Sequence, residues 1–355
     1  MVTKVALQVV DRLFKDLTGL DIPFGGKIIV FGGDFRQVLP VVRRGNRTTI
    51  VEASVKTSPL RWQVSRRPLT LNMRAANDPE FCNWLLKLGN GTLPIEPNVT
   101  PHSIAVPRQC YCPPADLIKE TFGTDTFTDT AIEQYIGTAI LCPKNEDCDK
   151  INEQVVESML TGHSKTYLSL DSVDTQDPLD QQLYPTEFLN SINPSGLPHH
   201  KIVLKINTII MLIRNLNSNR GLVNGTRLIV KQLNDYNIVA ETIQSHEPGN
   251  LLRQRVIIPR IVLTPPDPTM PFTLTRKQFP IKIAFAITIN KAQGQTLDRA
   301  GLYLPNPVFS HGQLYVAFSR VKSFANIKVA IEENAELRLR ENDFVTSNIV
   351  YTEVL

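Results

Sequence analysis

The 355-residue sequence has few cysteines, and they are scattered: Cys82, Cys110, Cys112, Cys142 and Cys148. None stand in a C-x-x-C pair, so neither a disulfide framework nor a zinc site is supported. The histidines also lack metal-ligand spacing, because His199 and His200 are adjacent and the others are isolated. We therefore expect reduced thiols, an intracellular protein and no metal held by cysteine or histidine.

The sequence also has no long apolar run. No stretch reaches the roughly 18 residues needed to cross a bilayer, and charges interrupt the apolar positions of the first residues, MVTKVALQVVDRLFKD. These absences exclude a membrane span and a secretion signal. The composition, with 42% hydrophobic and 20% charged residues, is that of a globular protein. A net charge of +4 and a pI near 8.7 suit a nucleic-acid partner without requiring one.

Two enzyme signatures are missing as well. No G-x-S-x-G elbow is present, so a hydrolase triad is unsupported. Gly26-Lys27 is the nearest approach to the phosphate loop G-x-x-x-x-G-K-[ST], but residue 21 is Asp, residue 28 is Ile, and the pair precedes an apolar run. No apolar strand ends in Asp-Glu, because IIVFGGDF reaches Asp34 through two glycines. The main anchors of a nucleotide are therefore absent.

The length predicts two or three domains. The spacing of apolar residues predicts an amphipathic helix in VALQVVDRLFKDLTGL, ended by Gly19. KIIVF and RPLTLNMRA are typical of short strands, the first of them buried. DPEFCNWLLKLGNG is typical of a helix that begins at Asp78 and is stopped by Gly89 and Gly91. This alternation predicts a partial α/β domain over residues 1–92.

The remaining chain divides by composition. Residues 93–135 are rich in proline and threonine and predict a linker, with a small helix at ADLIKETF. GTAILC and the segment after it predict a strand and helix of a second α/β domain, over 136–182 and 241–340. Between them, the Asn224-Gly225 turn signal predicts a β-hairpin in a small all-β insert, 183–240. Residues 341–355 are expected to form a C-terminal tail.

Polar residues follow two of the predicted strands. Gly32-Gly33-Asp34-Phe35-Arg36-Gln37 comes after KIIVF, and Thr288 to Thr296 comes after a second apolar run. Ligands of open α/β sheets bind beyond the carboxyl ends of strands, and amide and ammonium donors suit phosphate oxygens. The alternatives stay open: Asp34 could be a helix cap after a glycine turn, Lys291 could be a solvated charge, and Arg320 could form a structural salt bridge.

Five ordered motifs together resemble the Pif-type (petite integration frequency) DNA helicases, including relatives carried by Helitron transposons. They are FGGDFRQVLPVV, LTLNMR, GLVNGTRLIV, TINKAQGQTL and QLYVAFSRV, and they cover nearly the whole chain. The resemblance implies an α/β fold of the P-loop NTPase helicase class, with a partial first RecA-like domain and a second RecA-like domain that carries the all-β insert.

The resemblance also implies activity and partners. Family members use ATP and Mg²⁺ to move along single-stranded DNA, usually 5′ to 3′, with roles in DNA repair, recombination and telomere maintenance. For this chain it implies a monomer that binds single-stranded DNA, with no membrane partner. The implied compartment is the nucleus, with the mitochondrion as the alternative.

Family roles carry over to individual positions. Gln37, Arg74 and Arg320 would act on the terminal phosphate of ATP, with Gly33, Asp34, Gln293 and Gly294 beside the nucleotide. The positions implied to contact DNA are Phe35, Arg36, Asn224, Gly225, Thr226, Thr288, Asn290 and Lys291, with Gly221 in the same insert.

The sequence differs from the family pattern at its amino-terminal end. In the family, the phosphate loop and the Asp-Glu motif lie before the position of Met1. The expectation is a truncated copy or incomplete gene model that holds no metal, does not hydrolyse ATP alone, and is poorly soluble because strand edges lack neighbours. The alternatives are a binding module for single-stranded nucleic acid that turns nothing over and, less favoured, a regulatory partner of an intact helicase.

Overall fold

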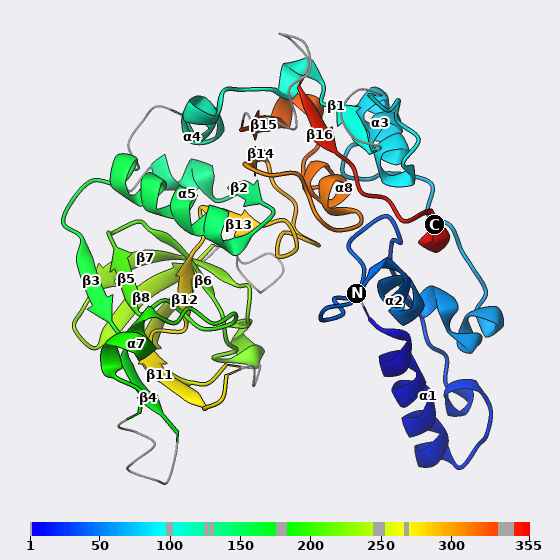
Figure 1. Ribbon diagram of the computed structural model, residues 1–355, viewed down its shortest axis with the longest axis horizontal. Coiled ribbons are helices and arrows are strands. Elements are labelled where there is room, and N and C mark those ends of the chain that lie inside the picture. Colours follow the sequence, from blue (N-terminus) through cyan, green and yellow to red (C-terminus); the bar gives the residue numbers. More distant parts are fainter. Residues whose placement is uncertain are drawn as a thin grey trace. The chain divides into compact units, whose positions relative to one another are not determined.

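The computed structural model (Figure 1) describes residues 2–96, 102–123, 127, 131–174, 183–243, 253–265, 270–332 and 344–355. The chain divides into two compact units. Unit 1 comprises Met1–Thr121, Leu141–Lys144 and Thr288–Leu355, and unit 2 comprises Phe122–Ile140 and Asn145–Ile287. In the described part of the chain, no helix is long and apolar enough to cross a membrane.

Unit 1 is built mainly from helices and short 3₁₀ turns. Its helices are α1 (Lys4–Thr18), α2 (Arg47–Ala53), α3 (Pro79–Asn90), α4 (Leu117–Phe122, which ends at the unit boundary) and α8 (Gln313–Phe318). Its strands are β1 (Ser103–Ala105), β14 (Arg299–Leu304), β15 (Ile327–Ile331) and β16 (Val345–Ser347). β14 and β15 pair in parallel. Strands β2 (Thr138–Cys142) and β13 (Ala286–Thr288) each contain a point at which the chain passes from unit 2 to unit 1. β1 and β16 pair antiparallel.

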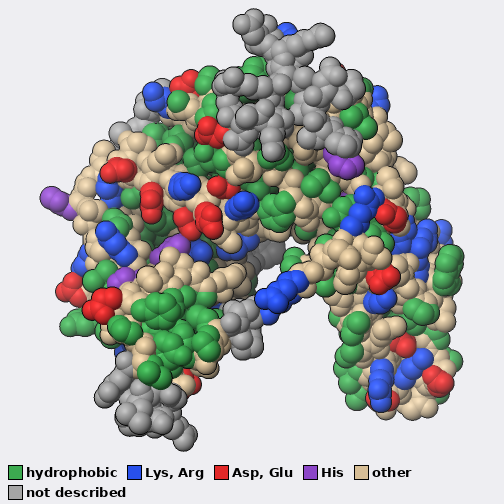
Figure 2. Space-filling view, in the orientation of Figure 1, with side chains coloured by type: hydrophobic (Ala, Val, Ile, Leu, Met, Phe, Trp, Pro, Cys, Tyr) green, Lys and Arg blue, Asp and Glu red, His purple; other side chains and the backbone are tan. Residues whose placement is uncertain are grey.

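Helix α1 confirms the predicted amphipathic helix. Thr3 caps its start by accepting a hydrogen bond from Ala6 N at 3.2 Å, and Gly19 ends it at a φ of +68°. Its apolar face is largely solvent-exposed, however, because Leu7 is buried whereas Leu13 and Leu17 are 54% and 73% exposed. Hydrophobic side chains are visible on the surface of this helix in Figure 2.

The predicted strands KIIVF and RPLTLNMRA are wrong. Both segments are outside any strand, and Ile28, Val30 and Leu69 are 95%, 89% and 98% exposed. A β-branched apolar run becomes a strand only where a neighbouring segment takes up its backbone N–H and C=O groups. Among the described residues, no segment pairs with either run, so propensity alone does not form the strand.

Helix α3 confirms the predicted boundaries at Asp78 and Gly91, although Gly89 lies inside the helix and does not end it, and it joins distant parts of unit 1. The Asp78 carboxylate caps it by accepting from Phe81 N at 2.9 Å, and Gly91 closes it at a φ of +68°. Phe81 packs edge-on against Phe324, with ring centroids 4.8 Å apart. Residues 79–90 and the chain around residue 324 therefore share one core.

The predicted C-terminal tail is also integrated into unit 1. Within the described residues 344–355, β16 pairs with β1, Asn348 Nδ2 donates to Leu88 O at 2.9 Å, and Val354 is fully buried. The sequence boundary failed because these contacts are with residues more than 200 positions away, which composition does not encode.

Replacing the α3 cap tests whether this helix depends on local capping. We expect Asp78→Ala to lower the free energy of unfolding of unit 1 by about 1 kcal/mol, since Phe81 N loses its acceptor. Urea unfolding followed by Trp84 fluorescence measures the change. Asn77→Ala, at the exposed position before the cap, is the matched control, and equal effects of the two variants would refute the capping role.

Unit 2 is mostly β-structure. Its helices are α5 (Asn145–Ser158) and α7 (Thr186–Ser191). Its strands are β3 (Lys165–Leu168), β4 (Leu170–Val173), β5 (Lys201–Leu204), β6 (Ile209–Leu212), β7 (Arg227–Leu233), β8 (Asn237–Thr242), β9 (Arg255–Pro259), β10 (Ile261–Leu263), β11 (Leu274–Gln278) and β12 (Ile281–Ile283). They form sheets of order β12-β6-β7-β8-β9, β10-β11-β4 and β3-β5.

The β-structure extends beyond the predicted insert of residues 183–240. β6 and β7 pair antiparallel, but residues 213–226 connect them, so the hairpin predicted around a two-residue Asn224-Gly225 turn is not what forms. β8, β9 and β12 continue the same sheet to Ile283. β3 and β4 add strands before residue 183. The boundary at 240 falls inside strand β8, because sheet partners are chosen by long-range pairing and not by a change in composition.

A buried ion pair organises one edge of unit 2. Asp171 on β4 and Arg276 on β11 are both fully buried, with Arg276 Nε and Nη2 donating to the two carboxylate oxygens at 2.9 and 2.6 Å. The same guanidinium donates to the carbonyls of Leu189, Ile192 and Pro198. Each of the three guanidinium nitrogens therefore donates to at least one partner, and the arginine holds the segment around α7 against the sheet.

Candidate functional site

Asp34 organises the loop that follows Gly33. Its Oδ1 accepts from Arg36 N at 3.0 Å, and its other oxygen accepts from the Tyr315 hydroxyl on α8 at 2.9 Å. Burial raises the pKa of Tyr315, so this hydroxyl keeps its proton. Arg36 Nε donates to Asn90 Oδ1 at 2.7 Å. The loop is therefore fastened to both α3 and α8.

Two residues just before α8 hold the same loop by its backbone. His311 is fully buried, and its Nδ1 accepts from Tyr351 N at 2.8 Å, so Nε2 carries the proton and donates to Phe35 O at 2.8 Å. Burial lowers the pKa of His311, which favours this neutral form. Gly312 has a φ of +71°, and a Cβ there would overlap the carbonyl of Arg36. Only glycine fits this contact.

The turn after β13 contacts the loop directly. Ala292 N donates to Thr288 O at 3.1 Å, and Gly294 continues the turn at a φ of +85°, which favours glycine. Gln293 Nε2 then donates to Gln37 Oε1 at 2.8 Å. The two polar segments that the sequence places after strands, 256 residues apart, are thus joined by their glutamines.

Arg74 attaches to the end of the same turn. Its Nη1 donates to Ser319 O at 2.7 Å, and its Nε and Nη2 donate to Thr296 Oγ1 at 3.1 and 2.8 Å. Its Nη2 also lies 3.4 Å from Gln295 O. Although the LTLNMR segment is not a strand, its arginine reaches the predicted site.

Arg320 is 2% exposed and fills the space beneath the turn. Its Nε donates to Val316 O at 2.9 Å, its Nη1 to Gln295 O at 3.1 Å and its Nη2 to Ser319 Oγ at 2.7 Å. Arg74 and Arg320 therefore share the carbonyl of Gln295 and lie side by side within unit 1.

The two guanidinium groups raise the local positive potential. Burial, followed by repulsion from Arg74, lowers the pKa of Arg320 to about 10, and burial lowers the pKa of Arg74. Among the described residues, neither arginine forms an ion pair, so the salt bridge considered for Arg320 is absent. Two adjacent cations without a carboxylate partner fit a polyanion such as a nucleotide's phosphates.

The same residues do not fit a protein-held magnesium ion. No group of three or more His, Cys, Asp or Glu side chains within the described ranges could hold a metal. The carboxylate of Asp34 is already engaged by Arg36 and Tyr315. Gly33 is exposed, and a Cβ there would meet nothing within 4 Å.

The positions predicted to contact DNA fall in both units. In unit 2, the turn before β7 is held by Asn224 N donating to Asn215 Oδ1 at 2.8 Å and by Thr226 Oγ1 donating to Gly221 O at 2.8 Å. Gly225 lies between them at a φ of +95°. The side chain of Asn224 is left without a protein partner in this turn, while Thr226 serves the turn itself.

The other predicted contacts lie in unit 1. Asn290 and Lys291 are exposed, Thr288 is half-buried, and Phe35 is 37% exposed. The Arg36 side chain is engaged with Asn90, so its role at DNA remains a prediction. Contact of Lys291 with a phosphate backbone likewise stays a prediction.

Sequence reasoning missed Arg227, which follows the turn of residues 221–226. Its guanidinium is enclosed and donates to Ile136 O, Thr138 O and Ala284 O at 3.1, 3.0 and 3.1 Å. Burial lowers its pKa to about 10. The available signal was one arginine at the start of the otherwise apolar run RLIV, where a charge needs a specific partner.

Asn152 on α5 is a second missed residue. Its Nδ2 donates to Ile283 O and Ala286 O at 3.1 and 3.0 Å, and its Oδ1 accepts from Ala286 N at 2.8 Å. It therefore fixes the chain between β12 and β13, just ahead of the turn that carries Gln293. An asparagine inside an amphipathic helix gives no sequence signal for this role.

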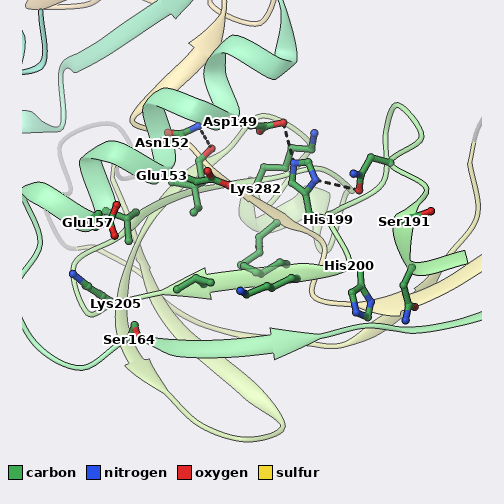
Figure 3. Close-up of a pocket in the computed structure, with 18 residues that line it drawn as sticks. Asp149, Asn152, Glu153, Glu157, Ser164, Ser191, His199, His200, Lys205 and Lys282 are labelled. Atoms are coloured by element: carbon green, nitrogen blue, oxygen red, sulfur yellow. Dashed lines mark hydrogen bonds and ion pairs between the residues drawn. The ribbon is translucent and has the colours of Figure 1, made fainter. Parts of the chain in front are cut away.

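A cavity of about 730 Å³ lies in unit 2 between α5 and strands β5 and β12 (Figure 3). His199 lies in the wall of this cavity, where its Nε2 is 3.0 Å from Asp149 Oδ2 and its Nδ1 is 3.3 Å from Asn193 Oδ1. Carboxylates of α5 and lysines of the strands line it together. It contains none of the predicted site residues.

Comparison with known proteins places this geometry in a family. The model of the PIF1-like helicases matches residues 1–98, and that of the DNA helicase Pif1 2B domain matches residues 187–233. The chain belongs to the PIF1-like helicases. It is 27% identical over 90% of its length to the ATP-dependent DNA helicase PIF1 of Xenopus laevis, and 30% identical over 86% to that of Homo sapiens. The chain spans 43% and 41% of these relatives.

Solved structures agree on the fold. A Bacteroides Pif1 helicase in complex with ADP-AlF3 and ssDNA has a TM-score of 0.62 at 20% identity, covering 96% of this chain and 71% of its own. The Candida albicans Pif1 helicase has a TM-score of 0.60 at 22% identity, covering 96% and 73%. The chain shares its α/β fold with these helicase structures, which confirms the predicted fold class.

Proposed function

We propose that this chain carries the part of an ATP-dependent DNA helicase that senses the terminal phosphate of ATP and holds single-stranded DNA. The observation that carries the proposal is the meeting of Gln37 with Gln293 and of Arg74 with Arg320 on one turn. Amide and guanidinium donors at one point suit the oxygens on which charge develops in phosphoryl transfer. ATP would supply the free energy for movement along DNA.

In this proposal, each side chain has a separate task. Arg74 and Arg320 would neutralise the terminal phosphate, and Gln37 would detect its presence. Gln293 would pass a displacement of Gln37 to the turn, and hence to Lys291 at the DNA. Movement from 5′ to 3′ and roles in repair, recombination and telomere maintenance extend the proposal by family and by the relatives named as DNA helicases.

A second function is favoured by the sequence itself. The 355 residues contain no G-x-x-x-x-G-K-[ST] loop, and removing such a cluster of phosphate ligands takes away most transition-state stabilisation. We propose that these residues alone do not turn over ATP and act as a binding module for single-stranded nucleic acid. The two functions share the DNA contacts and differ in hydrolysis, which a phosphate-release assay with oligonucleotide measures.

Binding of a fluorescent oligo(dT) tests the DNA contacts. We expect anisotropy to report binding at low salt, with log K falling linearly in log salt by roughly 0.7 per phosphate contact. Lys291→Gln should reduce that slope by about 0.7, because one cation is removed. Lys322→Gln is the matched control, because Lys322 is also an exposed lysine of unit 1, pairs with Asp298 at 2.8 Å and is not among the predicted DNA contacts. A chain that does not bind oligo(dT) at low salt would contradict the proposed binding of single-stranded DNA.

A further inference from the structure

Positive charge is concentrated in one segment of unit 1 that has no assigned role. Residues 43–67 carry seven basic side chains and one acidic one, Glu52, so the other 330 residues together carry a net charge of −2. We name these seven the cationic surface: Arg43, Arg44, Arg47, Lys56, Arg61, Arg66 and Arg67. Figure 2 shows several Lys and Arg side chains together on unit 1 beside α2. The net charge of the whole chain comes from this segment.

The cationic surface has a compact centre. Arg61 Nη1 donates to Lys56 O at 3.2 Å, which brings the turn η3 (Pro59–Gln63) against η2 (Val55–Thr57). Burial, followed by repulsion from Arg61 and Arg66, lowers the pKa of Lys56. The cations are therefore close enough to repel one another, and such an arrangement favours an anionic ligand.

Two aromatic rings lie among these cations. Trp62 is 82% exposed, and the guanidinium of Arg61 lies 5.4 Å from its ring centroid. The Lys56 ammonium lies 5.8 Å from the ring centroid of Phe35, which is 37% exposed. Exposed indole and phenyl rings beside basic groups are the elements on which unpaired bases stack while phosphates meet the cations.

We propose that Lys56, Arg61, Trp62 and Arg66 form a binding surface for single-stranded nucleic acid that extends from Phe35. A duplex would satisfy the charges but would leave Trp62 unused, because its bases are already stacked. Arg47 is outside this centre, since it pairs with Glu353 at 2.8 Å. This inference takes only the class of ligand, single-stranded nucleic acid, from the proposed function. The residues of this surface differ from those that carry the proposed function.

Trp62 is both the residue to replace and the source of a fluorescence signal for binding. We expect Trp62→Ala to weaken oligo(dT) binding by about 10- to 100-fold, and Trp62→Phe to restore most of the loss, because any aromatic face stacks. Oligo(dT) should quench the tryptophan fluorescence of the parent chain but not of Trp62→Phe, in which Trp84 alone remains. Arg66→Gln should lower the salt slope by about 0.7.

Leu69→Ala is the matched control, because Leu69 is 98% exposed and apolar but has no stacking face. Oligo(dT) binding that is unaffected by Trp62→Ala yet sensitive to Lys291→Gln would overturn the surface and leave the proposed function standing. Self-association that is lost in Trp62→Ala while DNA binding is retained would assign the surface to a protein contact and overturn the inference. Failure of the parent chain to bind any oligonucleotide would remove both proposals.

Discussion

Replacing Arg276 by methionine should lower the free energy of unfolding of unit 2 by about 3–5 kcal/mol. The change leaves the Asp171 carboxylate buried without its positive partner. The carbonyls of Leu189, Ile192 and Pro198 also lose the hydrogen-bond donor that Arg276 supplies. Urea unfolding followed by circular dichroism measures the loss. Hydrogen exchange of the β4 and β11 amides shows whether the loss is centred on this sheet.

A double replacement separates the pair from its surroundings. Asp171→Leu combined with Arg276→Met should recover much of the lost free energy of unfolding, because the double variant has no unpaired charge buried at this position. Arg255→Met is the surface control: its partner Glu241 is 3.5 Å away and its side chain is 72% exposed, so we expect a change of about 0–1 kcal/mol. Similar effects for Arg276→Met and Arg255→Met would show that burial of the pair does not set its importance.

Replacing Arg74 and Arg320 together by glutamine should abolish the preference for ATP over ADP. Each charge-assisted contact to phosphate contributes about 1.5–3 kcal/mol, so each single variant should lose roughly 10- to 100-fold in ATP affinity. The affinity for ADP should hold, because the proposed contacts are to the terminal phosphate. Calorimetric titration with millimolar ATP and ADP measures both constants.

Measuring the affinities for both ATP and ADP separates loss of a phosphate contact from loss of local structure. Arg320 also supports the turn through Val316 and Gln295, so a collapsed turn would weaken ATP and ADP alike. Equal losses for both nucleotides would therefore assign Arg320 a structural role and contradict phosphate sensing. Arg255→Gln in unit 2 should change neither affinity. A parent chain that binds ATP no better than ADP would also contradict the proposal.

Local features of the fold were predictable where neighbouring residues decide them. The ends of α1 and α3 follow from Thr3, Asp78 and the glycines at 19 and 91, because caps act over three or four residues. The Asn224-Gly225 signal likewise marks a turn, with Gly225 at a φ of +95°, although the whole connection between β6 and β7 spans residues 213–226. The strands expected at KIIVF and RPLTLNMRA failed because strands depend on partners that propensity does not supply.

The candidate site was predictable in its members but not in its contacts. Motif order singled out Gln37, Arg74, Gln293 and Arg320, all of which lie in one unit. Sequence reasoning divided them between two domains, whereas Phe81 against Phe324 and the fit of Gly312 against Arg36 unite their segments. Arg227 and Asn152 were missed because they bind backbone N–H and C=O groups, which every sequence provides.

The sequence by itself determined the family, the order of its motifs and the helix ends, since these depend on residue identity and on spacing along the chain. Only the tertiary structure decided which donors meet: that Gln293 binds Gln37, that two arginines share the carbonyl of Gln295, and that Trp62 lies exposed among cations. The reason is physical. Side-chain contacts and burial depend on distances between residues up to 256 positions apart, and packing alone fixes those distances.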